Sequence, residues 1–105
     1  MTGTTGSLRY MAPEVAMRQI YSEKVDVYSY GIMLWQMASD QIPFKGLSRD
    51  DFMERVVVGG ERPKIGALWP KRFIILLQAC WHADSRRRPS FEKVIDQIDQ
   101  MMKSN

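Results

Sequence analysis

Several common sequence signals are scarce in this chain of 105 residues, and each scarcity argues against a class of protein. Cys80 is the only cysteine, so no disulfide can form within the chain, and its apolar neighbours predict a buried thiol in a reducing compartment. The longest apolar run, residues 73–77, is too short to span a bilayer, and no stretch near Met1 resembles a signal peptide. We expect a cytosolic or nuclear chain, take the cytoplasm as its location, and expect no membrane partner.

Signals for metal and nucleic-acid binding are also scarce. His82 is the only histidine and has no second histidine, cysteine or acidic cluster at metal-ligand spacing, so we interpret it as a loop residue and expect no metal site. The net charge of +3 comes from fifteen basic and twelve acidic residues that are mixed along the chain. The run Arg86-Arg87-Arg88 favours a solvated or ion-paired loop over a phosphate-binding patch, so nucleic acid is not an expected partner.

The most informative stretch is residues 23–39, which contains no proline and a single glycine. Its apolar residues point nearly all round when they are read with a helical period, which predicts a buried central helix. Ser22 and Asp26 lie where a helix N-terminus favours a capping hydroxyl and a negative charge. Gly31 in the helix interior costs about 1 kcal/mol relative to alanine, so we expect another part of the chain to pack closely against it.

Two shorter helices are predicted on either side of a proline- and glycine-containing connector. Pro13 suits the first turn of a helix over residues 12–19. The S-x-x-D spacing from Ser48 to Asp51 begins a helix that ends at Gly59-Gly60. The only β-branched run lies at the end of this second helix, so we see no convincing strand.

The C-terminal third predicts two longer helices, over residues 70–81 and 90–102, and Ser90 is expected to cap the second. The first is apolar nearly all round and is therefore expected to be buried, and the second has one apolar stripe. The stripe consists of Phe91, Val94, Ile95, Ile98, Met101 and Met102. Leu68 and Trp69, in the segment before these helices, are expected to point inward. The sequence thus predicts one all-α domain of about five helices around a buried central helix.

Three segments, in this order and spacing, resemble the C-terminal half of a eukaryotic protein kinase domain. Residues 5–15, T-G-S-L-R-Y-M-A-P-E-V, are similar to the end of the activation segment with its A-P-E triplet. Residues 24–36, K-V-D-V-Y-S-Y-G-I-M-L-W-Q, resemble the family's central helix with its D-V-x-S-x-G pattern. Residues 80–91, C-W-H-A-D-S-R-R-R-P-S-F, resemble the stretch between the last two helices, with Ser85 in place of the expected proline. The G-S pair at Gly6-Ser7, the R-Y-M-A-P-E stretch and the C-W pattern are most similar to the tyrosine-kinase-like group of serine/threonine kinases.

The resemblance implies structural roles for five residues and, for the whole chain, the C-lobe part of an α+β kinase fold. Glu14 and Arg88 match a buried ion pair, in which arginine engages the carboxylate through two hydrogen bonds. Asp26 matches a residue that accepts backbone N–H groups of the catalytic loop, and the plainer alternative is a helix N-terminal charge worth about 0.3–1 kcal/mol. Gly31 belongs to the matched central helix, and Trp81 is the tryptophan of the C-W pattern, so both are expected to have structural roles.

The resemblance also implies where a substrate and a regulatory phosphate would lie. Gly6, Ser7, Leu8, Arg9 and Tyr10 match the surface that meets the protein substrate, and the hydroxyl of Ser7 favours serine and threonine substrates over tyrosine. The threonines of the same loop match a segment that is often phosphorylated in the family, where a phosphate orders the loop by pairing with arginine. These are Thr2, Thr4 and Thr5. Against this role, threonine is common in surface loops, and the family's usual arginine partner would lie before Met1.

The motifs that perform phosphoryl transfer in the family are missing from the 105 residues. The sequence has no G-x-G-x-x-G, no V-A-I-K-like lysine, no H-R-D and no D-F-G. We therefore assign no catalytic residue to this chain and expect it to bind no cofactor and to be inactive alone. ATP and Mg²⁺ are implied only for the complete kinase domain.

Our interpretation is that residues 1–105 are a partial kinase domain that lacks the N-lobe, the catalytic loop and the metal-binding motif. The parent would be a transferase that moves the γ-phosphate of ATP to protein serine or threonine. Its expected partners are a protein substrate and the missing remainder of the domain.

The alternative is a catalytically dead helical interaction module derived from a kinase C-lobe. Its docking surface would be the helix over residues 48–58 and the loop over residues 42–47. Tyr28, Tyr30 and Met33 favour the fragment, because they leave large apolar side chains where the catalytic loop would pack.

Overall fold

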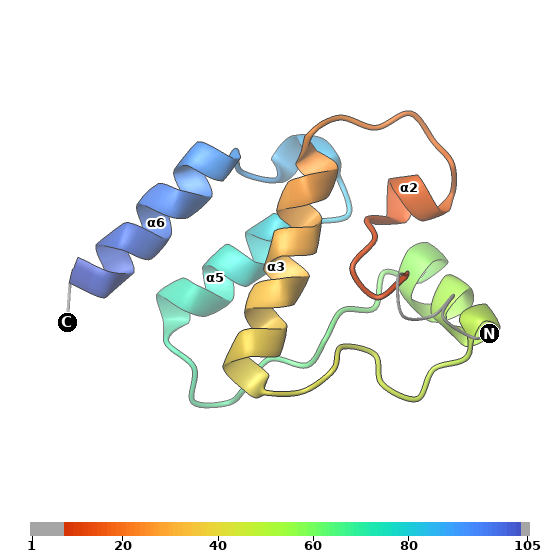
Figure 1. Cartoon of the computed structure of the whole chain (residues 1–105), viewed down its shortest axis with the longest axis horizontal. Helices are drawn as coiled ribbons and strands as arrows, with labels where there is room; N and C mark the ends of the chain where they lie inside the picture. Colours follow the sequence, from red (N-terminus) through yellow and green to blue (C-terminus); the bar gives the residue numbers. More distant parts are fainter. Residues whose placement is uncertain (1–7, 104–105) are drawn as a thin grey trace.

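The computed structural model describes residues 8–103, which fold into helices and loops without a β-strand (Figure 1). Within residues 8–103 the α-helices with established bounds are α2 (Pro13–Ala16), α3 (Lys24–Ser39), α4 (Arg49–Phe52), α5 (Lys71–Cys80) and α6 (Phe91–Lys103). A π-helix, η1 (Met53–Val58), continues α4, and a 3-10 turn, η2 (Ser85–Arg87), precedes α6. The prediction of an all-α fold with five helices is confirmed.

Local signals explain where these helices begin. Pro13 occupies the first turn of α2. The hydroxyl of Ser48 accepts a hydrogen bond from the backbone N–H of Asp51 at 3.1 Å, and the hydroxyl of Ser90 accepts one from Lys93 at 3.2 Å. Each hydroxyl satisfies an N–H group that the helix itself leaves unpaired. Both serine caps were predicted from the sequence, whereas the π-helical geometry of η1 was not.

Helix α3 is the central element, with α5 packed across it and α6 beyond α5 (Figure 1). Its buried face consists of Val27, Tyr28, Gly31, Ile32 and Trp35. A Cβ atom placed on Gly31 would lie only 2.7 Å from the Cβ of Cys80 in α5. The glycine is therefore what allows α5 to pack so closely, as the sequence predicted.

The opposite face of α3 is open, although the all-round apolar pattern predicts that it is covered. Met33 is 48% exposed and Met37 is 76% exposed. An apolar pattern on all sides indicates that the helix is suited to burial on all sides. Among the described residues, however, packing partners contact only one face of α3.

Two further burial predictions are corrected. Leu68 and Trp69 were both expected to point inward, but Leu68 is 96% exposed. Only Trp69 turns inward, and its ring packs edge-on against that of Phe73. In α6 the predicted stripe is narrower than expected. Val94 is fully buried, while Ile95 is 61% exposed, because only the part of the stripe that faces α3 and α5 finds partners.

Candidate substrate-facing site

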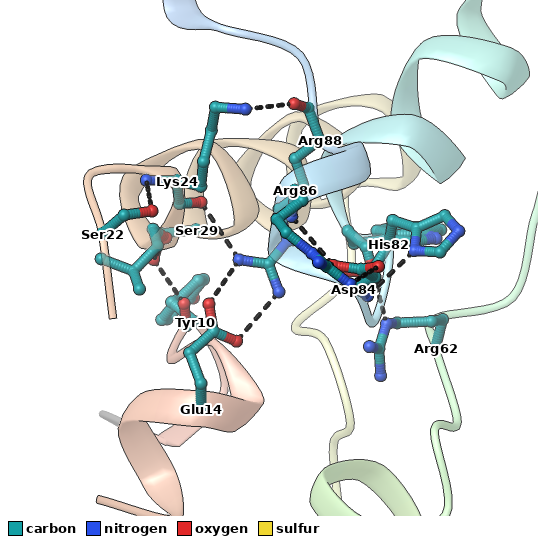
Figure 2. A network of polar contacts seen from close by, with 12 residues as sticks. Tyr10, Glu14, Ser22, Lys24, Ser29, Arg62, His82, Asp84, Arg86 and Arg88 are labelled. Atoms are coloured by element: carbon teal, nitrogen blue, oxygen red, sulfur yellow. Dashed lines mark hydrogen bonds and ion pairs between the residues drawn. The ribbon is translucent and has the colours of Figure 1, made fainter. Parts of the chain in front are cut away.

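The centre of the site is an ion pair between α2 and the loop before α6. Nη1 of Arg88 lies 2.7 Å from Oε2 of Glu14, and Nη2 lies 3.0 Å from Oε1 (Figure 2). The Arg88 side chain is fully buried and that of Glu14 is 12% exposed. Arg88 also donates from Nε to the carbonyl of His82 at 2.8 Å and from Nη1 to that of Lys24 at 3.2 Å. The guanidinium thus joins α2, the start of α3 and the 82–88 loop.

The ionisation of Glu14 follows from these contacts. Burial raises the pKa of its carboxyl, but the hydrogen bond from Arg88, backbone hydrogen bonding and the charges of Arg88 and Arg62 together outweigh burial. The net pKa lies below the usual value of 4.5. Glu14 is therefore a carboxylate at neutral pH, and the pair is a true ion pair.

A second arginine extends this cluster to the segment before α5. The guanidinium carbons of Arg62 and Arg88 lie 5.1 and 5.2 Å from the centroid of the Tyr28 ring. Tyr28 is fully buried, so it does not belong to the exposed patch that we expected it to form with Tyr30 and Met33. Arg62 also donates from Nε to the carbonyl of Trp81 at 2.9 Å. The sequence analysis missed Arg62, for which the only signal is its place before Pro63 in an otherwise irregular segment.

The loop that precedes α2 is held on the surface of α3 through Tyr10. The Tyr10 hydroxyl donates to Oε1 of Gln36 at 2.5 Å, and its backbone carbonyl accepts a hydrogen bond from the hydroxyl of Ser29 at 2.6 Å. Neither contact was predicted from the sequence, although Ser29 is the serine of the D-V-x-S-x-G pattern and the spacing of seven places Ser29 and Gln36 on one face of a helix. Leu8 anchors the other side of this loop in a cluster with Phe52 of α4.

The remaining candidate residues lie as follows. Arg9 is half-buried, and its Nε has no hydrogen-bond partner among residues 8–103. Trp81 is buried in the α3–α5 core. The proposed regulatory and substrate-loop residues Thr2, Thr4, Thr5, Gly6 and Ser7 lie outside the described residues.

Two hollows open along α3 beside Tyr10. The larger, of about 650 Å³, is lined by residues that include Tyr10, Met11, Asp26 and Ser29. Asp26 is exposed there, and within the described range its carboxylate makes no hydrogen bond or ion pair. The smaller, of about 370 Å³, is lined by Tyr10, Gln36 and the two exposed methionines of α3. One side of α3 therefore offers a carboxylate that has no partner among the described residues, beside an apolar surface.

The three consecutive arginines of the 82–88 loop lie in two different environments. Arg86 pairs with Asp84 at 3.2 Å, and Arg87 lies 3.9 Å from the same carboxylate, while Arg88 is buried. The run is thus an ion-paired loop and not a bare basic patch. His82 accepts a hydrogen bond at Nδ1 from the backbone of Asp84. In the part of the chain that the structure describes, no group of three potential ligands is placed to hold a metal, and no helix there could cross a membrane.

The A-P-E triplet at α2, tied by the buried Arg88 to the start of α3, agrees with the expected C-terminal part of a protein kinase domain. The sequence model of the protein tyrosine and serine/threonine kinases matches residues 1–98, and the chain belongs to this family. The predicted resemblance to a kinase domain is thereby confirmed.

Individual relatives agree with the family match. A probable serine/threonine-protein kinase of Dictyostelium discoideum is 39% identical over 96% of this chain. Serine/threonine-protein kinase STY17 of Arabidopsis thaliana is 36% identical over 98%, and mitogen-activated protein kinase kinase kinase 7 of Drosophila melanogaster is 36% identical over 98%. The chain spans only 11%, 18% and 15% of these three proteins. It corresponds to part of a serine/threonine kinase domain, and the alternative of a catalytically dead interaction module derived from a kinase C-lobe is not favoured.

Proposed function

We propose that this chain is the substrate-side helical part of a serine/threonine kinase domain of the tyrosine-kinase-like group. The complete domain transfers the γ-phosphate of ATP to serine or threonine of a protein substrate. The observation that carries this proposal is the bidentate Glu14–Arg88 pair, which fixes the A-P-E helix to the base of α3. The substrate-facing loop is thus held in place by a chain that itself lacks the phosphoryl-transfer motifs.

The proposal divides the work between this chain and the rest of the domain. ATP and Mg²⁺ supply the phosphoryl group and its charge neutralisation, and residues outside this chain hold both of them. This chain contributes Gly6, Ser7, Leu8, Arg9 and Tyr10, which contact the substrate, with Ser7 selecting hydroxyl substrates of the serine and threonine type. Tyr10 is suited to this role because its hydrogen bonds to Gln36 and Ser29 hold the loop in one position.

The open side of α3 supports the remainder of the kinase domain as a partner. The Asp26 carboxylate projects into a hollow without a described partner, and backbone N–H groups of a catalytic loop would satisfy it. Met33 and Met37 are exposed beside it, and an apolar face of the missing part would cover them. We place the protein in the cytoplasm, with phosphorylation of Thr2, Thr4 or Thr5 as its regulation.

A chimera tests the function directly. The segment of STY17 that aligns with this chain is replaced by residues 1–105, and transfer of labelled phosphate from ATP to a general protein substrate is measured. We expect phosphoserine and phosphothreonine as products, because the exchanged part keeps the Glu14–Arg88 anchor and the substrate loop. The isolated chain should neither bind ATP nor transfer phosphate.

Matched variants of the chimera separate function from folding. Arg88→Ala should abolish transfer, whereas Arg87→Ala, which removes a neighbouring exposed charge, should leave it intact. The proposal fails if the chimera folds and binds ATP but phosphorylates no protein, or if its only product is phosphotyrosine.

A further inference from the structure

Arg62 connects three helical segments, which are η1, α3 and α5. Its Nε donates to the carbonyl of Trp81, at the C-terminal end of α5, at 2.9 Å. Its Nη1 donates to the carbonyl of Glu61 at 2.9 Å and to that of Val56, in η1, at 3.5 Å. Its guanidinium carbon lies 5.1 Å from the centroid of the Tyr28 ring in α3. One half-buried side chain therefore joins the end of η1 to the two helices that form the core.

This connection matters because the chain that follows η1 has unusual conformational freedom. Two consecutive glycines come directly after η1, and Gly60 has a φ of +79°, in the left-handed region. Glycine adopts left-handed and right-handed conformations about equally readily, so it does little to fix the direction in which the chain continues. Arg62 follows two residues later and fixes that direction through its contacts with α3 and α5.

The π-helix η1 in turn supports the loop before α2. Leu8 of this loop is buried in one cluster with Phe52, Val56 and Val57. Met11, from the same loop, packs against this cluster. A shift of η1 would therefore move the loop that is proposed to contact the substrate.

A second route leads from Arg62 to α2. The guanidinium carbon of Arg88 lies 5.2 Å from the centroid of the same Tyr28 ring. Arg88 holds Glu14 of α2 through hydrogen bonds of 2.7 and 3.0 Å (Figure 2). Because Tyr28 is fully buried, a change at Arg62 alters the surroundings of the ring that Arg88 contacts. Two separate sets of contacts thus connect Arg62 to the segment that carries the A-P-E triplet.

We propose that Arg62 is a positioning residue for the kinase reaction, which holds the loop before α2 in the orientation that binds the protein substrate. This inference rests on the proposed function. Arg62 is not one of the substrate-contacting residues, so it acts only through η1 and Tyr28. Without it, fewer molecules hold the loop in the competent orientation, and the apparent affinity for the protein substrate falls by the same fraction. A bound substrate itself keeps the loop in place, so turnover changes little.

Steady-state kinetics of the STY17 chimera test this role. We expect Arg62→Met to raise the KM for the protein substrate about tenfold, in line with the loss of hydrogen bonds from a charged group. The kcat and the KM for ATP should stay within about twofold, because the substitution removes only substrate binding and residues outside this chain hold ATP. Arg62→Lys keeps the charge but not the planar fork of donors, so it should restore less than about half of the lost affinity.

Arg72→Met is the matched control. Arg72 also links two helices, through a hydrogen bond of 3.2 Å from α5 to Gln100 of α6, but neither of them is η1. Its loss should change neither the KM for the protein substrate nor the kcat. The proposal is overturned if Arg62→Met leaves the KM for the protein substrate unchanged, or if the kcat and the KM for ATP deteriorate as much as that KM does.

Hydrogen exchange of the 105-residue chain separates positioning from a general loss of stability. In Arg62→Met the backbone N–H groups of residues 8–17 should exchange about fivefold faster or more, whereas those of α6 should exchange as in the unchanged chain. Arg72→Met should leave residues 8–17 unchanged. Equal acceleration in α6, or acceleration confined to residues 56–62, would overturn the proposal.

The two measurements also distinguish this inference from the proposed function. A chimera that is inactive even without a substitution would contradict the proposed function, and hydrogen exchange would then decide by itself whether Arg62 holds the loop. If Arg62→Met does not fold, Arg62→Lys supplies the same comparison, because it keeps the positive charge beside Tyr28 and loses the second donor direction.

Discussion

Arg88 and Glu14 are 74 positions apart in the sequence, yet two hydrogen bonds of 2.7 and 3.0 Å join the guanidinium to the carboxylate. Arg88 holds the backbone carbonyls of His82 and Lys24 as well, so one buried side chain connects α2, α3 and the loop before α6. The planar guanidinium is suited to this, because its donors point in several fixed directions. A buried pair of this kind adds little net stability when intact, so we assign it the role of fixing α2 on the core.

Removal of one partner of this pair should be strongly destabilising. We expect Arg88→Ala to lower the free energy of unfolding by roughly 3–5 kcal/mol, because it leaves the Glu14 carboxylate buried without its counter-charge. Urea denaturation followed by circular dichroism measures this. Arg87→Ala is the control, since Arg87 is 73% exposed and lies 3.9 Å from Asp84, and it should change stability by less than about 0.5 kcal/mol. Equal losses in the two variants would contradict the assigned role.

The same pair predicts a pH dependence of stability. The pKa of Glu14 is lower in the folded chain than its usual value of 4.5. Its contribution is therefore complete above pH 4.5 and is lost as the pH falls through that value towards the folded pKa. The urea midpoint, measured between about pH 7 and pH 3, should fall at the acidic end. Glu14→Gln should show a shallower fall, and an unchanged slope would rule out this linkage.

Gly31 should not tolerate a side chain. A methyl group there would lie 2.7 Å from the Cβ of Cys80, and overpacking of this kind costs about 1–3 kcal/mol, which exceeds or offsets the gain in helix propensity. Thermal melting of Gly31→Ala should therefore show a lower midpoint. In a Cys80→Gly background the nearest remaining atoms of residue 80 lie 3.8 Å away, so the same substitution should be neutral or stabilising. A loss of the same size in both backgrounds would show that the contact is not responsible.

Cys80 should be chemically inert in the folded chain. It is fully buried, and burial raises the pKa of its thiol to about 12, so almost no thiolate exists at neutral pH. We expect no reaction with a thiol-specific reagent at pH 8 until urea unfolds the chain, after which one thiol is titrated. Rapid labelling of the folded chain would mean that α3 and α5 separate readily.

The open face of α3 should matter to the complete kinase domain more than to this chain. Met33→Glu and Met37→Glu replace exposed side chains, so each should change the stability of the isolated chain by less than about 0.5 kcal/mol. In the STY17 chimera the same changes should prevent folding and activity, because they bury a charge at the junction with the rest of the domain. Met102→Glu, at a methionine that is 71% exposed in α6, is the matched control and should affect neither. An active chimera that carries Met37→Glu would show that this face stays open.

Local features of the structure were predictable because their causes lie within a few residues. The Ser48 and Ser90 caps, the proline at the start of α2 and the close approach at Gly31 all follow from backbone hydrogen bonding and side-chain size. Residues whose role depends on distant partners were missed. Arg62 and Gln36 carry no local signal that distinguishes them from other polar residues, and the D-V-x-S-x-G pattern that contains Ser29 does not indicate its partner. Only the fold brings these residues to Tyr28 and Tyr10.

The sequence by itself determined where the five helices lie and the kinase family, since helical periodicity, capping residues and the A-P-E motif are short-range properties. The N-cap position expected at Ser22 was wrong, because the N-cap of α3 is Glu23, whose side chain makes no capping hydrogen bond. Only the tertiary structure decided which apolar residues are covered. It buries Tyr28 close to two guanidinium groups and leaves Leu68 and Met37 exposed, although all three are large and largely apolar. The physical reason is that burial depends on which distant segments pack against a side chain, and a periodic pattern records only that a residue is suited to such contact.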